Sequence, residues 1–68
     1  MYKVTLEAAR VNTKLTQKEA AKILSVSNKT LGNWEKGISY PPANKLAEMC
    51  ALYAVPYDHL IFLPNDSL

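Results

Sequence analysis

Hydrophobic residues recur along this chain at the three- and four-residue steps that mark short amphipathic helices. The clearest spacing falls in residues 43–53, at Leu46, Met49, Cys50 and Tyr53. Weaker versions of the same pattern cover residues 5–12, about 17–24 and about 28–36. A short fifth helix is predicted from Tyr57 to about Ile61, since Pro56 suits the start of a helix. No segment alternates as a strand does, so the pattern predicts an all-α fold in a single domain, residues 1–68.

Residues with known preferences for helix ends sharpen these boundaries. Thr5 and Ser27 are good N-caps, and the segment Thr16-Gln17-Lys18-Glu19 matches a capping box. Lys36-Gly37 is a typical helix ending. Only Ser25-Val26-Ser27 separates the second helix from the third, so these two helices are expected to meet at a tight turn. The third helix then turns Leu31 and Trp34 inward, and its opposite side carries no large apolar group.

The charge of the chain is unevenly distributed. Residues 1–45 hold eight Lys and Arg against three Glu, a net charge of +5, whereas residues 46–68 hold three carboxylates, a net charge of −3. This asymmetry favours a polyanionic partner for the first two-thirds, although the lysines could equally form a solvated surface. No stretch resembles a membrane span or a secretory signal, so a cytoplasmic location is expected.

The sequence contains few residues of the types that catalyse reactions or bind metals and cofactors. Cys50 and His59 are each the only residue of their type, so no cysteine-based metal cluster or internal disulfide is expected. Cys50 is interpreted as a small core residue and His59 as a partly exposed helix residue. The sequence also lacks paired carboxylates and a glycine-rich phosphate loop. No enzymatic activity is therefore predicted.

Several motifs in register resemble those of the phage-repressor and Cro type of helix-turn-helix, often named after the xenobiotic response element. They are residues 15–21 (LTQKEAA), 26–27 (VS), 34–37 (WEKG), 40–41 (YP) and 46–55. The resemblance implies a compact five-helix domain that places its third helix in the major groove of double-stranded DNA. It therefore implies a sequence-specific transcriptional regulator of phage, prophage or bacterial origin. The family often has Gly where this chain has Ser25 and Ala54.

The resemblance also implies which residues contact DNA. The expected base contacts lie on the outward side of the third helix: Asn28, Lys29, Gly32 and Asn33, with Thr30 at the edge. Asn can pair with adenine N6 and N7, and Lys can donate to guanine. Gly32 reflects either tolerated weakness in the helix or a close backbone approach. The expected phosphate contacts are Gln17, Lys18, Ser27, Lys14, Lys36 and Tyr40, although the Tyr40 ring could instead serve in packing.

Arg10 and Glu35 have a structural role in the family, where the two positions pair across the first and third helices. The resemblance therefore implies a buried salt bridge between them. Removing one partner of such a pair commonly costs about 3–5 kcal/mol when burial is complete.

The C-terminal part of the chain is more apolar than five short helices can bury. Tyr57, Leu60, Phe62 and Leu63 form an apolar cluster that continues into a tail over residues 62–68. Because family members bind two half-sites as dimers through this region, homodimerisation on DNA is expected. The alternative is a phage modulator or antirepressor that acts by binding another repressor protein through the same surface.

Overall fold

Side-chain caps begin the first three helices of the computed structural model, which describes residues 2–62. Thr5, Thr16 and Ser27 each have an extended backbone and accept a hydrogen bond from the backbone N–H three residues later. They precede α1 (Leu6–Asn12), α2 (Gln17–Leu24) and α3 (Asn28–Lys36). Glu19 completes the predicted capping box, because its carboxylate accepts from the Thr16 backbone N–H at 2.8 Å. The predicted bounds of these helices are confirmed, as are those of α4 (Ala43–Tyr53).

Three of the helices end at a residue in the left-handed region of backbone space. Gly37 ends α3 with φ 79°, as a glycine does readily. Ser25 ends α2 with φ 59° and Ala54 ends α4 with φ 55°. These are the two positions where the sequence has a side chain instead of the family's frequent glycine. Each carries a strain of about 1 kcal/mol that the rest of the packed domain has to offset.

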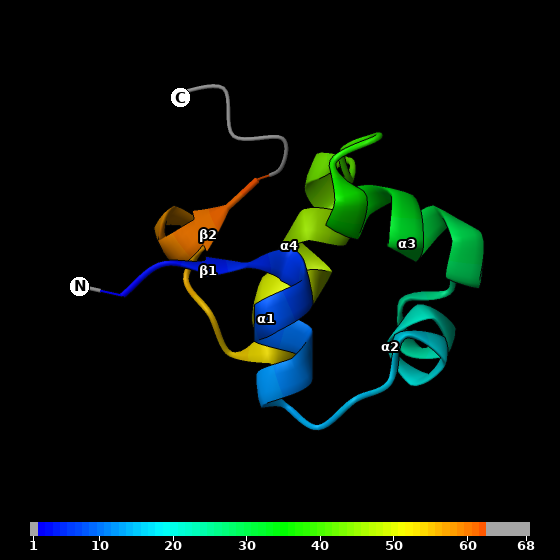
Figure 1. Cartoon of the computed structure of the whole chain (residues 1–68), viewed down its shortest axis with the longest axis horizontal. Coiled ribbons are helices and arrows are strands. Elements are labelled where there is room, and N and C mark those ends of the chain that lie inside the picture. The colour runs from blue at the N-terminus through cyan, green and yellow to red at the C-terminus, as the bar shows by residue number, and fades with distance from the viewer. Residues whose placement is uncertain (1, 63–68) are drawn as a thin grey trace.

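The core lies where the four helices meet. Leu24, Leu31 and Met49 are its largest fully buried side chains, and they come from α2, α3 and α4. Ala20 and Ala21 are also buried, and their small size lets α2 pack closely on α3. Figure 1 shows α2 and α3 beside each other at one end of the molecule, with α1 and α4 in the middle. The helix-turn-helix thus packs against a shared core.

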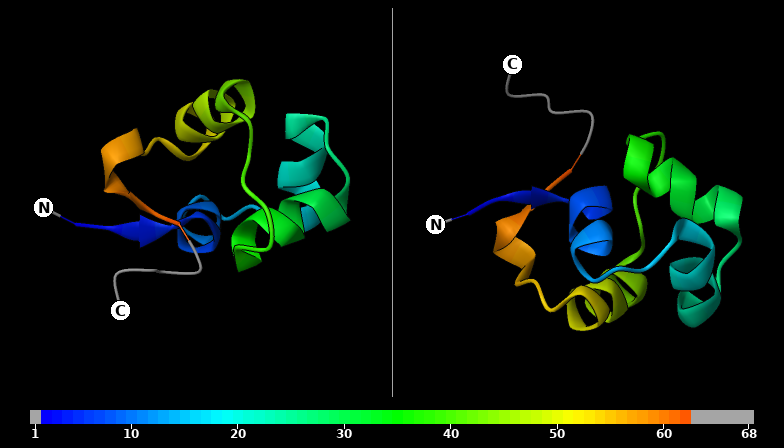
Figure 2. Two further views of the ribbon diagram at one scale, coloured as in Figure 1. Left: turned by 90° about the horizontal axis from the view of Figure 1, so that it is seen from above. Right: turned by 60° about the horizontal axis from the view of Figure 1, so that its bottom comes forward.

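The predicted fifth helix is wrong. Residues Tyr57–His59 form a single 3₁₀ turn, η1, and the chain then extends as β2 (Leu60–Ile61). β2 pairs in parallel with β1 (Val4–Thr5), with Val4 opposite Leu60 and Thr5 opposite Ile61. The two short strands lie together at the end of the molecule away from α2 and α3 (Figure 2). Two-residue strands are too short to show alternation, so the sequence pattern could not reveal them.

Two further contacts join the N-terminal segment to η1. The Lys3 ammonium donates to the backbone carbonyl of Asp58 at 3.0 Å, and the rings of Tyr2 and His59 meet edge to face with centroids 4.5 Å apart. Both contacts lie beside the β1–β2 pair, so the two ends of the described chain are joined at three neighbouring places. Over residues 2–62, none of the helices has the length and apolar character needed to cross a membrane.

Helix α4 differs from the predicted burial on one side. Met49 and Tyr53 are buried as expected, but Leu46 and Cys50 are only half-buried. They line an apolar groove of about 540 Å³ together with Ala43, Ala47 and Tyr57. Partial burial still raises the pKa of the Cys50 thiol. The periodicity of α4 therefore marks both a core face and an apolar surface next to it.

Candidate nucleic-acid interface

The turn between α2 and α3 fixes the relative orientation of the two helices. The Val26 backbone N–H donates to the Ala21 carbonyl at 3.0 Å, which closes the end of α2. The Ser27 hydroxyl accepts from the Thr30 backbone N–H at 3.0 Å and donates to the Thr30 hydroxyl at 2.8 Å. Ser27 is therefore a capping residue whose hydroxyl proton is already used inside the protein. Ser27 is itself exposed, and its contact with a phosphate stays a prediction.

The N-terminal end of α3 is its most accessible part. Asn28 and Lys29 are exposed, whereas Thr30 and Asn33 are half-buried. The first-turn N–H groups of a helix are unpaired within the helix, and together with its dipole they favour an anion at this end. Of the five residues expected to contact bases, Asn28 and Lys29 are thus the best placed to reach another molecule.

Helical spacing predicts that Gly32 lies open on the outward side of α3. The structure contradicts this prediction. Gly32 is buried, because the Gln17 side chain of α2 lies over it. A methyl group at position 32 would lie 3.4 Å from Gln17 Nε2 and 3.6 Å from Gln17 Oε1, which is ordinary van der Waals contact. The Gln17 amide thus packs against Gly32, and the Gly32 backbone is shielded from direct contact with a base.

A chain of hydrogen bonds joins the core to the exposed end of α3. Arg10 Nε donates to Glu35 Oε2 at 2.7 Å, and Arg10 Nη2 donates to Glu35 Oε1 at 3.3 Å. Gln17 Nε2 donates to the same Glu35 Oε1 at 3.0 Å, and Asn28 Nδ2 donates to Gln17 Oε1 at 2.9 Å. We call these four residues the amide relay. It runs from α1 through α3 and α2 and back to the first residue of α3.

Arg10 and Glu35 form the ion pair that the resemblance implied. Arg10 is 8% exposed and Glu35 is 5% exposed, so water is largely excluded from both groups. The hydrogen bond to Glu35 raises the pKa of Arg10 above its ordinary value. Arg10 Nη1 also donates to the Leu15 carbonyl at 2.8 Å, which ties the loop before α2 to α1. Burial raises the pKa of nearby Tyr53 to about 12.

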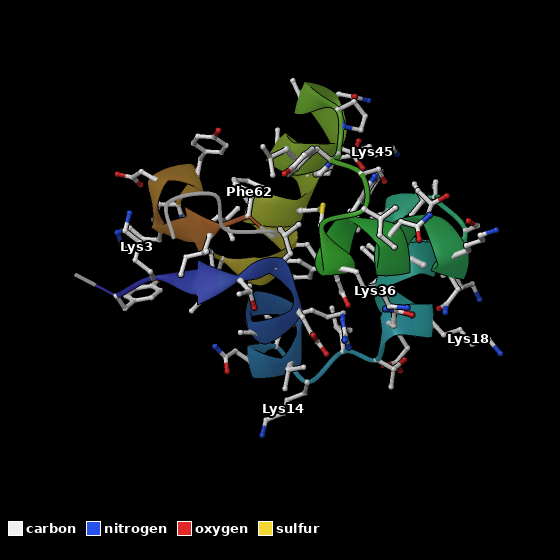
Figure 3. The ribbon with its side chains drawn as sticks, turned by 45° about the horizontal axis from the view of Figure 1, so that its top comes forward. Lys3, Lys14, Lys18, Lys36, Lys45 and Phe62 are labelled. Carbon is white, nitrogen blue, oxygen red and sulfur yellow. The ribbon has the colours of Figure 1, made fainter. Side chains whose placement is uncertain are left out.

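The lysines expected to contact phosphate are exposed and point outward. In Figure 3, Lys14 extends from the loop between α1 and α2, and Lys18 extends from α2. Lys36 lies in the last turn of α3 and is exposed as well. Lys14 has a left-handed backbone, with φ 66°, which sets the direction in which its side chain leaves the loop. Lys3 lies beside β1, far from Lys18 in the same view.

Lys45 is a structural lysine that sequence reasoning missed. Its ammonium donates to the Leu24 carbonyl at 2.6 Å, at the C-terminal end of α2, and lies 3.5 Å from Glu48 Oε1. A cation here satisfies a carbonyl that the helix leaves unpaired and complements the negative end of its dipole. Lys45 therefore links α4 to α2. No local sequence signal could reveal a contact between residues that are 21 positions apart.

The residues expected at a dimer interface divide into three groups. Leu60 is buried in the core and is not available to a partner, because β2 turns it inward. Leu63 lies outside the described residues. Tyr57 is 60% exposed and its ring lies 5.9 Å from that of the half-buried Phe62. Tyr40 is 55% exposed and meets Phe62 edge to face at 6.3 Å, so its ring packs as well as being accessible.

Comparisons with known proteins agree with this geometry. A protein-family model described as "Helix-turn-helix" matches residues 6–60, which include all four α-helices. The chain is also similar to the HTH-type transcriptional regulator ImmR of Bacillus subtilis (strain 168), with 38% identity over 56 residues. That match covers 82% of this chain and 44% of the relative, so the chain spans less than half of the relative's length. This chain belongs to the helix-turn-helix family that its sequence motifs predicted.

Proposed function

We propose that this protein is a transcriptional regulator that binds specific sequences of double-stranded DNA and inserts the N-terminal end of α3 into the major groove. The observation that carries the proposal is the exposed pair Asn28 and Lys29 at the start of a helix that packs on α2. A helix presented in this way can reach base edges with its first residues. The similarity to an HTH-type transcriptional regulator of Bacillus subtilis supports the same conclusion.

The exposed side chains have separate roles in this proposal. Asn28 pairs with adenine, and Lys29 donates to guanine, whereas Thr30 and Asn33 contact the groove from positions closer to the core. Lys14, Lys18 and Lys36 neutralise phosphates and supply affinity without sequence preference. Gln17 keeps one free amide N–H beyond its bond to Glu35, and this N–H can donate to a phosphate.

Salt dependence tests the phosphate contacts. Each contact lowers the slope of log affinity against log salt by about 0.9, so three lysines per chain predict a slope of about −3 for each bound chain. Fluorescence anisotropy across a salt series measures this slope on DNA selected from a random pool. Lys18→Met is expected to reduce the magnitude of the slope by about one and to leave the selected sequence unchanged. Failure to select any sequence from the pool would contradict the proposed function.

We also propose that two copies bind DNA together through the aromatic surface formed by Tyr40, Tyr57 and Phe62. Three neighbouring aromatic rings lie beside an apolar groove, and aromatic, apolar surface of this type is enriched in the buried centre of protein interfaces. A symmetric dimer would place two copies of α3 at two half-sites of the operator. The same surface could instead receive another repressor protein, which is the antirepressor alternative.

Sedimentation of the protein free and on DNA tests the dimer. Tyr57→Lys is expected to abolish it, because a charge would be buried at the centre of the contact. Val11→Lys is the matched control, since Val11 is an exposed apolar residue on α1 outside this surface, and it should leave the dimer unchanged. A wild-type protein that stays monomeric both free and on operator DNA would contradict the proposal. A stable complex with a purified repressor, without DNA binding, would favour the antirepressor.

A further inference from the structure

We propose that Glu35 is a positioning residue for base specificity, which acts through Gln17 to fix the hydrogen-bonding groups that Asn28 presents to DNA. This inference rests on the proposed function and deepens it. The basis is the amide relay, in which each bond determines the direction of the next. Glu35 is 5% exposed and lies on the inner side of α3, so it does not itself reach a base.

The direction of the relay begins at the carboxylate. Glu35 offers only acceptors to its neighbours, and its Oε1 lies 3.0 Å from the Gln17 amide nitrogen. The Gln17 amide must therefore turn its NH₂ group toward Glu35 and its oxygen away. The Gln17 oxygen can only accept a hydrogen bond, so Asn28 must turn its NH₂ group toward it. The Asn28 amide nitrogen lies 2.9 Å from this oxygen. Glu35 thus sets the orientation of two amides, although it contacts only the first.

Asn28 is left with one N–H and its carbonyl oxygen for a partner outside the protein. Adenine presents an acceptor at N7 and a donor at N6 in the major groove, which matches this pair. Guanine presents two acceptors, at N7 and O6. An Asn28 amide could offer two donors only by releasing Gln17, since one of its N–H groups is already used. The relay therefore favours adenine and disfavours guanine at the base pair that Asn28 contacts.

Two features keep the relay from reversing. Arg10 holds the Glu35 carboxylate through two hydrogen bonds, at 2.7 and 3.3 Å, in a place that water barely reaches. The Gln17 amide also packs against α3 at Gly32, with its Nε2, Oε1 and Cδ atoms 3.4–3.7 Å from where a Cβ at position 32 would be. An isolated exposed asparagine could rotate its amide by half a turn and so present either its NH₂ group or its oxygen to a given base atom. In this protein the half-turn would break the bond to Gln17.

The test uses selection from a random DNA pool and compares the base preferences of variants. Asn28→Ala first identifies the base pair that Asn28 reads, as the position whose preference it removes. Gln17→Met then removes both amide bonds and keeps a side chain of similar length over Gly32, with the Arg10–Glu35 pair intact. Lys18→Met is the matched control on the neighbouring residue of α2, where only a phosphate contact is expected to be lost.

For the wild type, adenine is expected to exceed guanine at that position by roughly 5- to 150-fold, the range of a good two-bond contact. Gln17→Met is expected to lower this ratio to below about threefold, whereas Lys18→Met weakens binding to all sequences alike. Loss of a phosphate contact alone cannot change the ratio. A Gln17→Met ratio equal to that of the wild type would overturn the proposal, as would a wild-type preference for guanine at this position.

Glu35→Gln tests the positioning residue directly. A glutamine at position 35 can present either its oxygen or its NH₂ group, so the direction of the relay is no longer fixed. The adenine-to-guanine ratio should fall as for Gln17→Met, even if overall affinity also falls because less of the variant is folded. Partial unfolding lowers affinity for every sequence equally. A folded Glu35→Gln variant with an unchanged ratio would overturn the proposal, and if this variant does not fold, the Gln17→Met result decides. Failure of wild-type selection would instead refute the proposed function.

Discussion

Replacing Arg10 with methionine is expected to destabilise the protein by about 3–5 kcal/mol, because the Glu35 carboxylate would remain buried without its partner. Methionine fills a similar volume, so the lost packing contributes little. A domain of 68 residues has a total stability of roughly 3–10 kcal/mol. The variant should therefore lose a large share of its stability, and urea denaturation followed by circular dichroism measures the difference.

A double variant distinguishes the destabilisation caused by one unpaired buried charge from the net contribution of the ion pair to stability. Arg10→Met combined with Glu35→Leu removes both charges, and replacing a buried pair by apolar residues is often neutral or stabilising. The double variant is expected to recover most of the stability that Arg10→Met loses. Glu7→Gln is the matched control, since Glu7 is exposed and its carboxylate lies as far as 4.0 Å from Arg10 Nη2. This substitution should change stability by less than about 1 kcal/mol. An Arg10→Met variant as stable as the wild type would contradict this account.

Replacing Leu31 with alanine is expected to cost about 2–5 kcal/mol, through lost burial and the cavity left behind. Leu31 is fully buried and attaches α3 to the core, so this variant tests the support on which the proposed DNA-reading end depends. Leucine and alanine are both good helix formers. The effect therefore reports on packing rather than on helix propensity, and chemical denaturation of the two proteins measures it.

Ile23→Ala on α2 is the matched control for this substitution. Ile23 is 55% exposed, so its truncation should change stability by no more than about 0.5 kcal/mol. Equal effects of Leu31→Ala and Ile23→Ala would mean that α3 is not packed as described. A much larger effect of Leu31→Ala is the expected outcome.

Much of the candidate site followed from sequence, but its internal connections did not. The resemblance pointed to Gln17, Asn28 and Glu35 as functional or structural residues. It did not predict that a single side chain of α2 would bond both others. Gly32 was assigned to the outward side because helical spacing locates a residue on its own helix only. Burial of Gly32 depends on Gln17, which belongs to the neighbouring helix.

Local sequence alone was enough to predict where the four α-helices begin and end. Thr5, Thr16 and Ser27 bond to backbone groups three residues away, so the information that starts each helix is contained within one turn. The positions of two left-handed helix ends, Ser25 and Ala54, also had a signal in the family pattern. Here the family pattern indicated positions that glycine would suit, and both have a positive φ.

Contacts between distant parts of the chain could be known only once the helices had packed together. Residues 60–61 are extended rather than helical because they pair with residues 4–5, and Lys45 is structural because α4 brings it to the end of α2. The same holds for the amide relay, whose bonds span 11, 18 and 25 positions. Helix starts need only nearby hydrogen-bond partners, whereas these contacts require the packed core to bring their partners together.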